Sequence, residues 1–405
     1  MSGDTGGGEA LIGGDYQGKN SMIKNAWRTY IDKDATINAD ASNSGDGGKV
    51  IVWADDTSKF YGHISSVGGA LGGDGGFTEV SGKNFLDFQG TADLSSRYGE
   101  IGTLLLDPDN VEVKSSGLAG VGGVDEFADT GATRKINANT LNNAAANVTI
   151  QANNNITVDQ KINLTTSGAT LTFQAKNNIT LNQSITTNDG AIKLIANNDF
   201  ISTKAIDSGT ATTIIASDAG TIGLGDSTCK GSCDMTISST ELSKITAANL
   251  KIGDASTGKI YTDNVSESDT SNVSGTVTLT NSSDIIFHGQ KSFFSTLTLT
   301  ADRNISIETS VETTVGNFTA TADADSDDEG KFTLDTGKTL TSAGNVTIDA
   351  VQIERFGSID ATGSTTLTGE LVTTDSGNTK KKKPDQAEAS LFTNALMGIA
   401  KNPGC

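Results

Sequence analysis

Apolar and polar residues alternate through most of the chain, in runs of five to eight residues bounded by Gly, Asn or Asp. Clear examples occupy residues 49–54, 148–152, 171–175, 276–280 and 296–300. Successive side chains of a strand point to opposite faces, and β-branched residues are favoured there, so each run predicts a short, half-buried strand. Because helix signals are scarce before residue 385, the pattern predicts an all-β protein.

One unit recurs along the chain, at residues 147–158, 170–181, 191–202, 297–307 and, weakly, 345–350. Within the first three copies, Ala152, Ala175 and Ala196 occupy equivalent places, about 21 to 23 residues apart. A period just above twenty, with two or three strands per unit, fits one coil of a parallel β-helix. A propeller blade needs about forty residues, and an immunoglobulin sandwich does not repeat.

Such coils are expected to turn Val, Ile and Leu inward and to stack at roughly 4.8 Å, with Thr and Asn outside or at the corners. Stacked Asn side chains can then hydrogen-bond from coil to coil. Narrow coils leave little space for aromatic rings, which agrees with an aromatic content of 5%. About fifteen coils would form a rod on the order of 70 Å long.

Composition divides the chain into three parts. Residues 1–113 are Gly-dense, residues 114–379 carry the repeated coils, and residues 380–405 contain a Lys-rich linker and an amphipathic helix over 385–400. Gly-Asp-Gly-Gly occurs at 45–48 and 73–76, each time before a strand. These glycines predict tight turns between coils, because a phosphate-binding loop would need a following Lys-Ser/Thr and a helix.

Charge excludes several classes of partner. The chain has 49 acidic and 29 basic residues, for a net charge of −20. This balance disfavours nucleic acids and anionic membrane surfaces, which need clustered Lys and Arg. Two His leave little room for His-based metal or acid–base chemistry.

No apolar run approaches the ~20 residues of a membrane span, and residues 1–8 lack the features of a signal peptide.

Four ordered segments between residues 10 and 113 resemble a known family: Leu11-Ile-Gly-Gly-Asp-Tyr-Gln-Gly18, Ala39-Asp-Ala-Ser-Asn-Ser-Gly-Asp-Gly-Gly-Lys-Val-Ile-Val-Trp-Ala-Asp-Asp56, Gly73-Asp-Gly-Gly-Phe-Thr-Glu-Val-Ser-Gly-Lys83 and Gly102-Thr-Leu-Leu-Leu-Asp-Pro-Asp-Asn-Val111. They look like the stretch that follows the secretion domain in exoproteins of the filamentous-haemagglutinin family. The high-molecular-weight adhesins of two-partner secretion systems carry a similar segment. The resemblance covers about a quarter of the chain. The coils after residue 140 resemble those of the family only in their general pattern.

This resemblance implies a right-handed parallel β-helix, exported through a dedicated outer-membrane transporter and then secreted or held at the bacterial surface. Family members serve as surface adhesins, or as stalks that carry other activities. Their secretion domain would precede residue 1, so we expect this chain to be a C-terminal portion or part of a split reading frame. The helix at 385–400 is then either a cap on the open end of the solenoid or a tether or docking element.

Cysteines and acidic residues supply the candidate sites. Cys229 and Cys233 are a close pair that can form a disulfide in an oxidising compartment. Cys405 is either an incidental thiol or part of an anchor, as in some related adhesins. Asp323, Asp325, Asp327 and Glu329 form the densest acidic run and can supply oxygen ligands to Ca²⁺. The run lacks the EF-hand Gly and Glu, so a solvated loop is the favoured interpretation.

Asn-X-Ser/Thr sequons are possible glycosylation sites, although many arise from the Asn/Thr-rich composition. They begin at Asn147, Asn155, Asn163, Asn178, Asn182, Asn264, Asn272, Asn281, Asn304, Asn317 and Asn345.

No catalytic constellation or cofactor site is predicted, because His63 and His288 are far apart in the sequence and no Ser/His/Asp arrangement is suggested. The favoured hypothesis is a non-catalytic adhesin-like rod that binds a receptor or glycan on host or neighbouring cells. A passive stalk that presents other domains is the alternative. A polysaccharide-active β-helix enzyme is the third hypothesis, although the aromatic and basic residues that usually line such grooves are sparse here.

Overall fold

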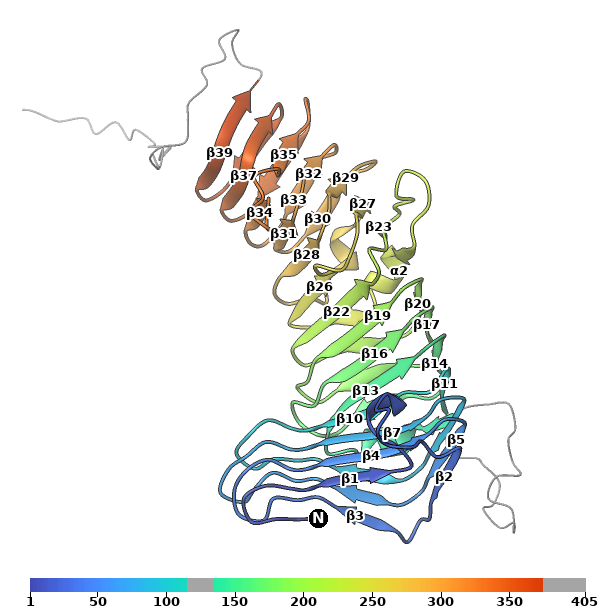
Figure 1. Cartoon of the computed structure of the whole chain (residues 1–405). Coiled ribbons are helices and arrows are strands. Elements are labelled where there is room, and N and C mark those ends of the chain that lie inside the picture. The colour runs from blue at the N-terminus through green and yellow to red at the C-terminus, as the bar shows by residue number, and fades with distance from the viewer. Residues whose placement is uncertain (115–134, 374–405) are drawn as a thin grey trace, which may run out of the picture.

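The structure is a computed structural model that describes residues 1–114 and 135–373. It confirms the all-β prediction: the chain winds into a parallel β-helix with three strands in a typical coil. Figure 1 shows the coils stacked into an elongated solenoid. The predicted helix at 385–400 and Cys405 lie outside the described residues.

The first face of the solenoid is one continuous parallel ladder of fourteen strands, close to the expected number of coils. In stacking order these are β1 (Glu9–Ile12), β4 (Lys49–Ala54), β7 (Phe77–Gly82), β10 (Thr103–Leu106), β13 (Asn147–Ala152), β16 (Leu171–Ala175), β19 (Ile192–Ala196), β22 (Ala211–Ala216), β26 (Asn249–Ile252), β28 (Val277–Asn281), β31 (Leu297–Ala301), β34 (Phe318–Ala322), β37 (Val346–Arg355) and β39 (Thr365–Thr373).

The second face has two ladders. One contains β2 (Arg28–Ile31), β5 (Thr57–Phe60), β8 (Phe85–Phe88), β12 (Lys135–Asn137), β11 (Val111–Lys114), β14 (Ile156–Val158), β17 (Ile179–Leu181) and β20 (Phe200–Ser202). The other contains β24 (Met235–Ile237), β23 (Ile222–Gly225), β27 (Ile260–Asp263), β29 (Ile285–Phe287), β32 (Ile305–Ile307) and β35 (Lys331–Leu334), and pairs with the second half of β37.

The third face is built from three shorter ladders. These are β3 (Thr36–Asn38), β6 (His63–Ser65) and β9 (Thr91–Asp93); β15 (Ile162–Leu164), β18 (Ile185–Thr187), β21 (Ile206–Asp207) and β25 (Ile245–Thr246); and β30 (Ser292–Phe294), β33 (Val311–Thr313), β36 (Thr339–Ser342) and β38 (Ser358–Ala361). Short helical turns interrupt the coils: η1 (Tyr16–Gly18), α1 (Ala138–Asn142), α2 (Ser239–Leu242) and η2 (Glu267–Asp269).

Apolar residues at every second strand position fill the interior, as the alternation predicts. Ile150, Phe173 and Leu194 occupy one position in three successive coils, and each is essentially buried. The expectation that the coils leave little space for aromatic rings was too strong. Eight Phe side chains are fully buried, and Phe60 stacks on Phe88 with ring centroids 5.5 Å apart. Phe residues are few in this chain, but most of them lie in the interior.

Coil length varies more than the repeat in the sequence predicts. On the first face, Val148, Leu171, Ile192 and Thr212 are paired in succession and are almost evenly spaced along the chain. The next step, from Thr212 to Leu250, is almost twice as long because it includes the 226–234 loop and α2. The ladder therefore stays continuous although some corner connections are long loops, which we call excursions. This is possible because only the strands must stay in register.

Polar corners also stack from coil to coil. The Asn155 side chain accepts hydrogen bonds from the Asn177 side chain and the Asn178 amide, at 3.0 and 3.1 Å. Asn178 in turn accepts from Asn198 at 2.8 Å. The Gly-Asp-Gly-Gly segments form stacked turns before β4 and β7, as predicted. At Gly73, φ is +128° and a Cβ would lie 1.9 Å from the Gly45 carbonyl, so only glycine permits this approach.

Candidate functional site

An excursion covers the outward face of the first ladder near the N-terminus. We call residues 13–27, which connect β1 to β2, the strap; they include η1. In Figure 1 this dark blue turn lies in front of β7. Gln17 adopts φ +53°, and its backbone N–H donates to the Glu79 carboxylate at 3.0 Å. The Gln17 side chain donates to Asp107 at 3.3 Å and to Gln151 at 3.2 Å. Gln17 alone therefore contacts three successive coils.

Glu79 is an outward-facing residue of β7 that is fully buried beneath the strap. Its ladder partners are Ile51 on β4 and Leu105 on β10, which are also buried and also point outward. Burial between these apolar side chains raises the pKa of Glu79 from 4.5 to about 7. Burial likewise raises the pKa of Asp107 above its ordinary value.

The strap also covers Trp53 of β4, whose side chain is 5% exposed. A Cβ at Gly18 would lie 2.6 Å from the indole ring, and φ of Gly18 is +62°. Lys49 fixes the start of the strap through Asp15, at 2.9 Å. Hydrogen bonds from Asn20 and Lys49 lower the pKa of Asp15 to about 2. This covered cluster was not predicted from the sequence, in which Glu79 and Trp53 occupy solvent-facing positions of the alternation.

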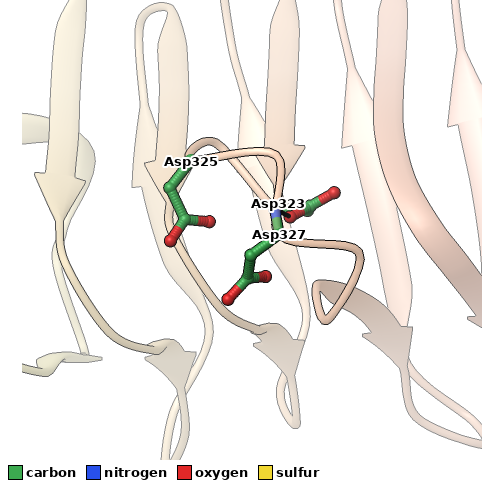
Figure 2. Close-up of side chains that lie close together, drawn as sticks. All are labelled: Asp323, Asp325 and Asp327. Carbon is green, nitrogen blue, oxygen red and sulfur yellow. Dashed lines mark hydrogen bonds between the residues drawn. The ribbon is translucent and has the colours of Figure 1, made fainter.

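The structure brings together three of the four acidic residues singled out in the sequence. Carboxylate oxygens of Asp323, Asp325 and Asp327 lie within 4.8 Å of one another in the loop between β34 and β35 (Figure 2). Asp323 accepts the backbone N–H groups of Asp327 and Asp328, at 2.8 and 3.1 Å. Partial desolvation and the neighbouring acids raise the pKa of Asp327.

Glu329 is not part of that group. Its carboxylate lies 3.8 Å from the Arg303 guanidinium, in an exposed ion pair. Asp302 is a nearby acid that was not predicted from the sequence: burial and the charges of Asp325 and Asp327 raise its pKa. Asp325 and Asp327 are exposed, and Asp323 is occupied by backbone donors, so the arrangement remains compatible with a solvated loop.

A second excursion joins β23 to β24. In it Cys229 and Cys233 form a disulfide, with Cα atoms 5.3 Å apart. Ser227 Oγ lies 3.0 Å from His288 Nε2, and Lys230 Nζ lies 2.6 Å from the Glu308 carboxylate. The loop thus crosses later coils, because His288 and Glu308 directly follow β29 and β32.

A Ser–His contact is the start of a nucleophilic site, and this pair was not predicted from the sequence. Ser227 Oγ also accepts the backbone N–H of Cys229, at 3.2 Å, and Ser227 is 6% exposed. Among the described residues, no carboxylate hydrogen-bonds the other ring nitrogen of His288. Catalysis by serine needs an accessible hydroxyl and an oriented base. The contact is better suited to holding the loop in place. His63, by contrast, contacts Thr91 on the third face.

The sequon asparagines differ in exposure. Asn163, Asn182, Asn272, Asn317 and Asn345 are exposed, whereas Asn147, Asn155, Asn178, Asn264 and Asn304 are half-buried. Asn281 is buried, and its side-chain nitrogen donates to the Gly258 and Asp284 carbonyls, both at 2.8 Å. A glycan at Asn281 would require both hydrogen bonds to break.

Surface hollows are shallow and open. One lies near the C-terminal end of the described coils and includes Thr314, Thr341 and Asp360; another, near the N-terminus, includes Ser42, Val67 and Arg97. Neither matches any site predicted from the sequence. Within the described parts of the chain, no helix has the length and apolar character needed to cross a membrane.

No protein-family model matches the chain, and no curated protein matches it with significant similarity. The fold and the residue geometry above are therefore the basis for any functional inference.

Proposed function

We propose that the chain is a non-catalytic, adhesin-like rod of a secreted or surface-held exoprotein. The observation that carries this proposal is a lattice of outward-facing threonines on the first ladder. One column pairs Thr278, Thr298, Thr319, Thr347 and Thr366. A parallel column contains Thr280, Thr300, Thr321, Asp349 and Thr368.

This lattice suits broad, multivalent contact. Each threonine offers a hydroxyl and a methyl group on a stiff side chain, so little rotamer freedom is lost on binding. The columns are half-exposed on β28, β31 and β34, and exposed on β39. Individually weak contacts to a glycan or protein surface would add along the ladder. The resemblance to filamentous-haemagglutinin exoproteins supports the same function, with a two-partner-secretion transporter as the export partner.

Binding of the purified chain to cells, glycans and matrix proteins tests the proposal. We expect saturable binding that weakens at least tenfold, or about 1.4 kcal/mol, when Thr278, Thr298 and Thr319 are all replaced by Arg. The matched control makes the same replacement at Thr149, Thr172 and Thr213, which lie on the same ladder in earlier coils, where Lys193 interrupts the threonine column. That control should leave binding unchanged.

Failure has two distinct forms. The absence of saturable binding would favour a passive stalk. Release of reducing sugars or unsaturated uronates from acidic polysaccharides would instead favour a β-helix enzyme and contradict the non-catalytic proposal.

A further inference from the structure

The strap holds an acidic residue out of water, and this geometry gives it a means of responding to pH. We propose that residues 13–27 form a pH-sensitive strap, which closes firmly over the first ladder while Glu79 is protonated and loosens when Glu79 ionises. The inference concerns the N-terminal coils and does not depend on the adhesive function proposed above.

Glu79 has little to compensate a negative charge when the strap is closed. Ile51 and Leu105 flank it along the ladder, and its polar contacts come from the Gln17 N–H and from Ser81. Opening the strap would remove Gln17 and expose the carboxylate to water. An isolated carboxylate is far better solvated in water than between apolar side chains.

When the strap is closed, the charged groups around Glu79 favour its neutral form more than they favour its ionised form. Asp107, on the neighbouring strand end, disfavours a second negative charge, and its own pKa is raised by burial. Lys49 on β4 favours the ionised form, but it is already paired with Asp15 and Glu9. On the strap, Lys19 donates to the Gln17 side chain, and burial raises the pKa of Tyr16, which stays neutral in this range.

The sign of the effect follows from these values. The pKa of Glu79 is about 7 when the strap is closed and near 4.5 when it is solvated. Below pH 4.5 both forms are protonated, so closure has its full stability with respect to this group. Between pH 4.5 and 7 the open form ionises first, and closure weakens as pH rises. Above pH 7 the loss is complete, up to about 300-fold in the closing equilibrium.

Asp15 has the opposite effect, because it makes closure of the strap weaker at low pH. Its pKa is lowered to about 2 by hydrogen bonds from Asn20, Lys49 and the Tyr16 amide, and of these the Lys49 contact is the one that joins the strap to the ladder. Closure therefore also weakens as pH falls from 3.8 toward 2. The strap should be most firmly closed near pH 4, between these two transitions.

Hydrogen exchange on the full chain measures this directly. After correction for intrinsic exchange rates, the protection of peptides covering residues 13–27 should fall between pH 4.5 and pH 8, by up to about 300-fold. Glu79→Gln should keep high protection across that range, because the amide oxygen still accepts from Gln17 and carries no charge. Glu241→Gln is the matched control: Glu241 is another buried carboxylate, which caps α2, and it should leave the pH response of the strap intact.

Trp53 provides a second readout that does not depend on Glu79→Gln folding correctly. In a Trp27→Phe background, which removes the exposed indole, acrylamide quenching of Trp53 should rise from pH 4.5 to pH 8. Protection and quenching that do not change with pH in the unsubstituted chain would overturn the proposal. An identical pH response in Glu79→Gln would overturn it as well.

Discussion

The first ladder has two very different outer surfaces. In the coils of β4, β7 and β10 the strap covers it, so that Ile51, Trp53 and Glu79 are buried although they point away from the interior. In the coils of β28, β31 and β34 the same outward positions carry threonines that remain partly exposed. The backbone geometry is shared: both regions are parallel and in register.

The difference teaches that the interior and the exterior of a coil are specified separately. Alternation and stacking define the interior, and they allow excursions only at the corners. An excursion that folds back across the ladder turns solvent-facing positions into a second buried layer. The chain can therefore change the surface it presents without altering its solenoid, and the substitutions below test this separation.

The largest effect is expected when an outward-facing residue under the strap and one on the uncovered ladder are each replaced by Ala. Trp53→Ala should cost about 3–5 kcal/mol of local stability, as an interior aromatic would, because the strap buries the indole. Thr319→Ala, at an outward position of β34, should change stability by no more than about 0.5 kcal/mol. Urea titration followed by hydrogen exchange of each coil would measure both. Equal losses at the two sites would mean that the surfaces do not differ as described.

A smaller effect is expected from two glycines that share the left-handed conformation. Gly18→Ala should destabilise the strap by about 1–3 kcal/mol more than Gly168→Ala destabilises its own turn. Backbone strain is common to both positions, at φ +62° and +76°, but only the new Cβ at position 18 meets Trp53. The same exchange measurement applies. If Gly18→Ala costs no more stability than Gly168→Ala, the strap can move away from Trp53 without a loss of stability.

Removal of the disulfide should affect only its own excursion. Replacing Cys229 and Cys233 by Ser should cost about 2 kcal/mol locally, from the entropy of the freed loop. It should also weaken the Ser227–His288 and Lys230–Glu308 contacts. Limited trypsin digestion should then cut faster after Lys230, whereas cutting after the exposed Lys204 serves as the reference and should not change. Unchanged cutting at Lys230 would show that the ion pair alone fixes the loop.

The smallest effect is expected at the acidic loop. Because backbone amides occupy Asp323 and Arg303 holds Glu329, Ca²⁺ should bind with a dissociation constant no tighter than about 1 mM. Isothermal titration calorimetry should give the same weak heats for the unsubstituted chain and for Asp325→Asn. Micromolar binding that is lost in Asp325→Asn would identify a true calcium site.

The repeated coils could be predicted from the sequence because the interior pattern is local. The positions of Ile150, Phe173 and Leu194 follow from alternation and from the regular spacing of the repeated unit, and their register is as predicted. The corner asparagines followed from the same repeat. These features require no knowledge of how distant segments meet.

The covered site could not be predicted because it depends on distant contacts. The run Thr78-Glu79-Val80-Ser81 alternates like any other, and Gln17, which covers Glu79, lies 62 residues earlier. Ser227 and His288 are 61 residues apart, and intervening coils of unequal length determine that they meet. The glycines at 13, 14 and 18 were the only local signal, since they mark a chain that turns sharply beside a large side chain.

The ladders described above have a mechanical consequence. Backbone hydrogen bonds between coils run along the axis of the solenoid, so tension along that axis would load one coil boundary after another rather than many bonds at once. A typical coil that detaches would release up to about 70 Å of chain, against a stacking distance of roughly 4.8 Å. A rod built in this way can lengthen in steps under load while the remaining coils stay folded.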